Sequence, residues 1–144
     1  MRRVAAIVAI AAIKINAARV CVALVTGWNL QAAFIFIVNP GKFAHAYELS
    51  GIPGEAAIRG FGILFLMWNI PYLFAAKDPA RYKLALNIAL LSQLIGFIGE
   101  SYIFHTLTLE HIPLRNSILR FILFDGAGVF LLAISWMLLR DKES

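Results

Sequence analysis

The sequence predicts an all-α, polytopic integral membrane protein: a four-helix bundle preceded by an N-terminal helix that is either interfacial or continuous with the first span. Hydrophobic residues make up 61% of the 144 residues, and the mean hydropathy is +0.80. Both values lie well above those of a soluble domain. Four apolar runs also have about the 20 helical residues that a bilayer crossing needs. We therefore expect one transmembrane domain over residues 1–144.

Charged residues, prolines and glycines bound the four apolar runs. Asn39-Pro40-Gly41 ends the first run, because proline cannot continue a helix and glycine tolerates the exit conformation. Lys77-Asp78-Pro79 separates the second run from the third, and Ile112-Pro113 breaks the link between the third and the fourth. The predicted spans are residues 20–38, 56–76, 84–107 and 118–139.

Residues 1–19 form a separate N-terminal segment. Arg2-Arg3 followed by the apolar run 4–13 resembles the charged and apolar regions of a secretory signal. An apolar run of this length is too short to cross a bilayer. We therefore expect an interfacial helix along the cytoplasmic leaflet, with a helix continuous with the first span as the alternative.

The distribution of Lys and Arg predicts the orientation. Cytoplasmic segments of membrane proteins carry an excess of these residues. With a cytoplasmic N-terminus, nine of the thirteen lie inside, namely Arg2, Arg3, Lys14, Arg19, Lys77, Arg81, Lys83, Arg140 and Lys142. The four on the other side are Lys42, Arg59, Arg115 and Arg120. We therefore expect a multi-pass protein in the lipid bilayer with both termini in the cytoplasm.

Two acidic residues within the predicted spans are the main candidates for function, because ionisable groups in a bilayer are costly and usually pair or bind something. Glu100 precedes the outer end of the third span by about seven residues, and Asp125 follows the outer start of the fourth by about seven. Both would then lie at one level, about 10 Å below the outer surface. The candidate ligand-binding residues of this outer zone are Arg59, Glu100, His105, Arg120, Asp125 and Asn29.

Within this zone, Glu100, Asp125 and His105 are the candidate catalytic residues. Gly126-Ala127-Gly128 follows Asp125, and such small residues let another backbone or a ligand approach closely. A purely structural alternative stays open, in which the arginines and acids neutralise one another. Asn69 and Gln93, in the inner half, are explained by interhelical amide hydrogen bonds of about 0.6 kcal/mol each. In the alternative, a kink at Pro71 opens a polar path from Asn69 through Gln93 to Glu100, as in a small transporter.

Several functional classes are disfavoured. The net charge of +5 does not indicate nucleic-acid binding, because Lys and Arg flank apolar segments instead of forming a basic stripe. The single cysteine, Cys21, excludes an internal disulfide and a CxxC pair. None of the three histidines forms an HxxxH or HExxH pattern, so we expect no metal site. No cofactor can be named from the sequence.

The order of parts resembles the broad DoxX-like group of small four-helix bacterial membrane proteins. The shared features are an N-terminal span, an outer loop with Pro and Gly, and a second span that opens with Ala57-Ile58-Arg59-Gly60-Phe61-Gly62. The resemblance covers most of the chain in architecture and six residues in motif. It implies a plasma membrane location and association with membrane redox or quinone-linked complexes. Glu100 and Asp125 are not carried over from that group.

Three functional hypotheses follow. The first is a binding or accessory protein whose charged outer zone holds a small polar ligand, a lipid headgroup or a partner subunit. The second is a membrane enzyme in which Glu100 or Asp125 acts as acid or base on a lipid-soluble substrate, while Arg59 or Arg120 holds its anionic part. The third is a small transporter that forms a homo-oligomer, because four helices rarely enclose a path alone.

Overall fold

The computed structural model describes residues 1–140, and within this range every regular element is a helix. Four helices are long and apolar enough to cross a membrane, which confirms the predicted number. They are α1 (Arg2–Val38), α3 (Gly51–Lys77), α4 (Lys83–Thr106) and α5 (Ile112–Arg140). A short α2 (Pro40–Ala44) and a 3₁₀ turn, η1 (His45–Tyr47), connect α1 to α3.

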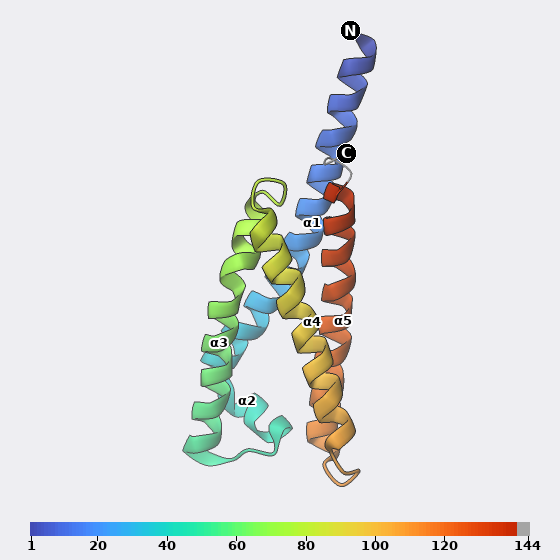
Figure 1. Ribbon diagram of the computed structural model, residues 1–144. Coiled ribbons are helices and arrows are strands. Elements are labelled where there is room, and N and C mark those ends of the chain that lie inside the picture. Colours follow the sequence, from blue (N-terminus) through green and yellow to red (C-terminus); the bar gives the residue numbers. More distant parts are fainter. Residues whose placement is uncertain (141–144) are drawn as a thin grey trace.

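The four long helices form a ring around a shared centre. α1 packs against α3 and α5, and α4 packs against the same two helices, so α1 and α4 lie diagonally opposite each other. We call the end that carries α2, η1 and the 107–111 link the cap end, and the end that carries the 78–82 link the termini end. The N-terminus and the end of α5 both lie toward the termini end (Figure 1). Lys142 and the C-terminus itself lie outside the described residues.

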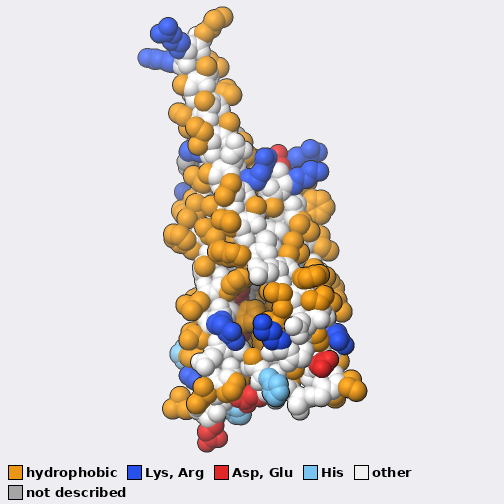
Figure 2. Space-filling model, turned by 180° about the vertical axis from the view of Figure 1, so that it is seen from behind, with side chains coloured by type: hydrophobic (Ala, Val, Ile, Leu, Met, Phe, Trp, Pro, Cys, Tyr) orange, Lys and Arg blue, Asp and Glu red, His pale blue; other side chains and the backbone are white. Residues whose placement is uncertain are grey.

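The structure resolves the alternatives for the N-terminal segment in favour of a continuous helix. Residues 14–19 contain neither glycine nor proline, so nothing in the sequence ends the helix between the apolar run 4–13 and the first span. The expected separate interfacial helix is therefore not what the structure shows. A helix of 37 residues is about 55 Å long, and its first turns project beyond the bundle with exposed side chains (Figures 1 and 2).

Two helices begin earlier than predicted. α5 starts at Ile112, six residues before the expected start at 118, with Pro113 in its first turn. α3 starts at Gly51 with Pro53 in its first turn. Proline fits the first turn of a helix, because the N–H that it lacks has no partner there. Ile112-Pro113 therefore begins a helix instead of lengthening the link.

Two apolar clusters fill the ring, one at each end. The cluster toward the termini end contains Val22, Leu86 and Leu132, and the cluster at the cap end is built on Phe36 and Ile58. Asn29 on α1, Asn69 on α3 and Asp125 on α5 fall between these clusters, whereas Tyr72 belongs to the cluster toward the termini end. The packing therefore leaves a polar layer between two apolar ones.

Polar contacts hold the cap end to the start of α5. The Ser117 hydroxyl donates to the carbonyl oxygen of Ala46 at 3.0 Å, and His111 contacts Glu48 at 2.5 Å. The Arg115 guanidinium donates to two carbonyl oxygens at the end of α4, those of Phe104 and Leu107, at 3.1 and 2.6 Å. It satisfies acceptors that the helix itself leaves unpaired.

Candidate functional site

Side chains from all four long helices meet at Gln93, near the middle of α4. Gln93 is only 4% exposed. Its Oε1 accepts hydrogen bonds from the Tyr72 hydroxyl at 2.7 Å and from the Asn29 amide at 3.5 Å. Its Nε2 donates to Asp125 Oδ1 at 2.7 Å. One amide therefore joins α1, α3, α4 and α5.

Two glycines make room for this junction. A Cβ at Gly96 of α4 would lie 2.5 Å from Asp125 Oδ2, and a Cβ at Gly128 of α5 would lie 2.7 Å from Gln93 Nε2. The spacing Gln93-x-x-Gly96 on α4 thus repeats as Asp125-x-x-Gly128 on α5. Each polar side chain rests on the glycine of the opposite helix, as close helix packing through small residues allows.

A cavity of about 110 Å³ adjoins the junction, and we call it the central cavity. Its polar lining comes from all four long helices, and its apolar lining is largely aromatic. The residues that line it are Asn29, Ala32, Phe65, Trp68, Asn69, Tyr72, Ser92, Gln93, Gly96, Glu100, Phe121, Phe124 and Asp125.

The central cavity is rich in hydrogen-bond acceptors. Asn69 is only 2% exposed; its amide nitrogen donates to the Phe65 carbonyl at 2.7 Å, while its Oδ1 has no hydrogen-bond partner. If the Asn69 amide were flipped, its Oδ1 would face the Phe65 carbonyl oxygen, and two acceptors would be in contact. The hydrogen bond to Phe65 therefore requires that the nitrogen faces the carbonyl and that Oδ1 is the unpaired atom. Within residues 1–140, no ion pair joins Glu100 or Asp125 to a basic side chain. The cavity thus combines two carboxyl groups with an unpaired amide oxygen.

The predicted candidate residues divide into three groups. Asn29, Glu100 and Asp125 line the central cavity. Arg120 lies on a different hollow, described below. Arg59 is a correction, because its side chain is 54% exposed and its Nη2 lies 3.6 Å from Glu55 Oε2, one turn away on the same helix.

His105 is a second correction. It is exposed, lines neither the central cavity nor the Arg120 hollow, and packs edge-on against the neighbouring Phe104 ring. Although the i, i+5 spacing from Glu100 places both on one helix, it turns their side chains well away from each other around the axis. The structure therefore gives His105 no part in the site.

The sequence predicted that Glu100 and Asp125 lie at one level of the bundle, but in the structure they lie at different levels. Because α5 begins at Ile112, Asp125 is thirteen residues, or about 20 Å, from the helix start. Its carboxylate lies against Gly96, one turn or about 6 Å nearer the termini end than Glu100 on α4. The site therefore lies closer to the middle of the bundle than the outer zone that we expected.

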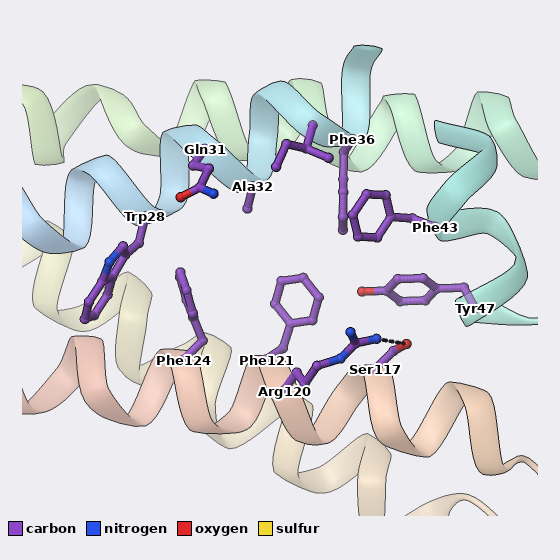
Figure 3. A pocket seen from close by; sticks show the side chains of 11 residues that line it. Trp28, Gln31, Ala32, Phe36, Phe43, Tyr47, Ser117, Arg120, Phe121 and Phe124 are labelled. Carbon is purple, nitrogen blue, oxygen red and sulfur yellow. Dashed lines mark hydrogen bonds between the residues drawn. The ribbon is translucent and has the colours of Figure 1, made fainter. Parts of the chain in front are cut away.

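A second hollow of about 240 Å³ lies between α1, the α2–η1 segment and α5 (Figure 3), and we call it the aromatic groove. Ala32, Phe121 and Phe124 line both hollows and form the wall between them. Seen from behind, the molecule is hollowed in the half nearer the cap end, with Lys or Arg side chains at the edge (Figure 2). The residues that line the groove are Trp28, Gln31, Ala32, Ile35, Phe36, Phe43, Tyr47, Ser117, Arg120, Phe121 and Phe124.

Three polar residues at the centre of the site were not among the predicted site residues. Asn69 and Gln93 were interpreted as structural hydrogen bonds of the inner half, with a polar path to Glu100 as the alternative, and Tyr72 was not singled out. The repeated spacing of a polar residue and a glycine, in Gln93-x-x-Gly96 and Asp125-x-x-Gly128, is the signal that could have identified the contact between α4 and α5. It could not have identified Tyr72, which reaches Gln93 from α3.

The part of the chain that the structure describes contains no set of side chains suited to hold a metal ion. No group of three His, Cys, Asp or Glu side chains comes together among residues 1–140. Glu100 and Asp125 share the central cavity without a third such ligand.

Comparisons with protein-family models, with curated proteins and with solved structures gave no match. The resemblance to the DoxX-like group therefore stays a prediction.

Proposed function

We propose that the protein is a multi-pass integral membrane protein that binds the polar end of a small amphipathic molecule in its central cavity. Four helices long enough to cross a bilayer support the membrane location. Large apolar side chains cover the outside of the bundle, for example Leu64, Ile95 and Phe130, whereas the amide and carboxyl groups of the junction face inward. This distribution suits a hydrocarbon solvent.

The orientation that we propose places the termini end in the cytoplasm. Lys77, Arg81, Lys83 and Arg140 gather at that end, as the excess of Lys and Arg in cytoplasmic segments requires. Arg2, Arg3, Lys14 and Arg19 lie toward the same end, whereas the cap end carries Lys42, Arg59, Arg115 and Arg120. The plasma membrane location stays a prediction from the sequence.

The acceptor-rich lining favours a ligand with a cationic or hydrogen-bond-donating group. Bare carboxylates are costly in a bilayer, and no basic side chain within residues 1–140 forms an ion pair with Glu100 or Asp125. An amine or hydroxyl of a ligand would donate to Asn69 Oδ1, which has no hydrogen-bond partner, and to the carboxyl groups of Glu100 and Asp125, of which Asp125 already accepts one hydrogen bond from Gln93. This set of acceptors, one of them buried and unpaired, is the observation that carries the proposal.

The size of the central cavity indicates how much of the ligand it holds. About 110 Å³ is less than the roughly 300–1,000 Å³ of a pocket that encloses a drug-sized molecule. The ligand's apolar part would therefore extend out of the cavity. We propose that it passes between α3 and α4, which diverge toward the cap end (Figure 1), beside the 59% exposed Trp68.

A fluorescence titration tests this proposal. The double variant Trp28→Phe/Trp136→Phe keeps Trp68 as the one tryptophan of the chain, and Trp68 lines the cavity. Dodecylamine, dodecanol and dodecanoate share an alkyl chain and differ in the polar group. We expect saturable changes in Trp68 emission with dodecylamine, weaker ones with dodecanol and none with dodecanoate.

Acid substitutions provide the matched controls. Adding Glu100→Gln and Asp125→Asn to the Trp68 variant should weaken dodecylamine binding at least about tenfold, because two charge-assisted contacts are lost. Glu55→Gln removes an acid outside the cavity and should leave binding unchanged. Equal responses to the three compounds, or equal binding by the acid-substituted and control proteins, would contradict the proposal.

A membrane enzyme is the second candidate, because two carboxyl groups line one cavity. Glu100 or Asp125 would then transfer a proton to or from a lipid-soluble substrate. Retained ligand binding with lost turnover in Asp125→Asn would favour this alternative. The transporter hypothesis has less support, because the apolar cluster of Val22, Leu86 and Leu132 fills the ring on the termini side of Gln93.

A further inference from the structure

The aromatic groove is a candidate site of its own, separate from the central cavity. Six of the eleven residues that line it are aromatic, and they come from α1, the α2–η1 segment and α5 (Figure 3). Phe121 contacts the rings of Phe36 and Tyr47, with centroid distances of 6.0 and 6.5 Å. The lining is thus largely apolar, apart from Gln31 and the polar groups near the cap end.

Arg120 is the charged group of this groove. Its Nη2 donates to Ser117 Oγ at 3.2 Å, and no carboxylate within residues 1–140 forms an ion pair with it. A guanidinium has five N–H donors, so most of the hydrogen-bonding capacity of Arg120 is unused. Arg59, at the same end of the bundle, differs because it is paired with Glu55.

Tyr47 supplies a second unpaired donor at the same place. Its hydroxyl points into the groove, near the Arg120 guanidinium (Figure 3), and it makes no hydrogen bond within residues 1–140. Burial raises the pKa of the Tyr47 phenol above its ordinary value; the negative charge of Glu100 raises it further, and the positive charge of Arg120 lowers it. The phenol is therefore a donor at neutral pH, and Arg120 is close enough to act on it.

We propose that the aromatic groove binds an anionic phospholipid, with the phosphate at Arg120 and Tyr47 and an acyl chain along the aromatic rings. Guanidinium groups bind phosphate oxygens through paired, charge-assisted hydrogen bonds. A soluble anion would gain nothing from six aromatic rings, whereas an acyl chain gains from burying apolar surface.

Native mass spectrometry of the full-length protein tests this inference. The protein is equilibrated with phosphatidylglycerol and phosphatidylcholine that carry identical acyl chains. We expect one phosphatidylglycerol to be retained in preference to phosphatidylcholine. Arg120→Gln should reduce this preference at least about tenfold, or 1.4 kcal/mol at 25 °C, while Arg59→Gln should leave it unchanged.

A second measurement covers the case in which Arg120→Gln fails to fold. Trp68→Phe/Trp136→Phe leaves Trp28, which lines the groove, as the one tryptophan. Brominated phosphatidylglycerol should quench Trp28 more strongly than brominated phosphatidylcholine, and Tyr47→Phe should weaken that difference.

The inference is overturned if the two lipids bind or quench equally, if Arg120→Gln and Tyr47→Phe both behave as wild type, or if Arg59→Gln has as large an effect as Arg120→Gln. Because Trp28 reports on the groove and Trp68 on the central cavity, failure here leaves the proposed function separately testable.

Discussion

The contact between Asp125 and Gly96 predicts that a larger residue at position 96 lowers the free energy of unfolding. In Gly96→Ala the new Cβ would lie 2.5 Å from Asp125 Oδ2, whereas ordinary contacts begin near 3.4 Å. The carboxylate would have to retreat by roughly 1 Å, which breaks its 2.7 Å hydrogen bond with Gln93. Gly99→Ala, one turn along the same helix, meets no atom within 4 Å and is the matched control.

The expected magnitude follows from three contributions. Forcing an atom into a packed helix contact costs about 1–3 kcal/mol. Loss of an interhelical hydrogen bond in a membrane protein adds about 0.6 kcal/mol on average and up to about 1.7. The higher helix propensity of alanine offsets about 1 kcal/mol of this cost. Gly96→Ala should therefore lower the free energy of unfolding by about 0.6–3.7 kcal/mol, whereas Gly99→Ala should leave it unchanged or raise it by up to about 1 kcal/mol.

Reversible unfolding in mixed micelles of mild detergent and sodium dodecyl sulfate, followed by circular dichroism, measures both variants. Gly128→Ala, whose Cβ would meet Gln93 at 2.7 Å, should behave like Gly96→Ala. The reasoning is refuted if Gly96→Ala is as stable as Gly99→Ala. In that case the small residues would not hold the polar junction in place.

Three further predictions concern other parts of the chain. Arg115→Ala should lower the free energy of unfolding by about 1–3 kcal/mol in the same assay, because two carbonyl oxygens at the end of α4 lose their charged donor; equal stability would contradict this. Deleting residues 2–12 should leave the melting temperature within about 2 °C of the full chain, since the first buried residue of α1 is Ala18; a large decrease would show that the projecting turns contact the bundle. Tyr47 should make stability fall with rising pH above about 10, because the unfolded chain loses the phenol proton there while the folded chain, with its raised pKa, keeps it. Unfolding measurements at pH 9 to 11 test this. If the stability of Tyr47→Phe falls as much as that of the wild type, another group causes the fall.

The number of helices and their approximate spans were predictable from the sequence, because hydropathy and run length depend on composition alone. The residues at which the helices begin were less predictable. Pro53 and Pro113 were expected outside the helices, yet both lie in a first turn, where proline is tolerated. In the sequence, a proline that ends a helix cannot be told from a proline in the first turn of the next helix. The packing of the surrounding residues determines which of the two occurs.

The candidate site was predictable only in part. Depth arithmetic selected Glu100 and Asp125, and both line the central cavity. The same arithmetic also selected Arg59, and the helix shared with Glu100 selected His105. Both face elsewhere, because depth along a helix carries no information about rotation around its axis. Gln93, the residue at which four helices meet, was interpreted from the sequence as one of two inner amides that form interhelical hydrogen bonds. Its role depends on contacts between helices that no single apolar run reveals.

Mass spectrometry of what co-purifies in native lipid tests the central claim most directly. The wild-type protein and the variant Glu100→Gln/Asp125→Asn are purified in parallel from the same membranes. An amphipathic molecule with an amine or hydroxyl donor, close to one per chain, should accompany the wild-type protein and be lost from the variant, while bulk lipid stays the same. Identical sets of molecules in equal amounts on both proteins would contradict a binding role for the central cavity.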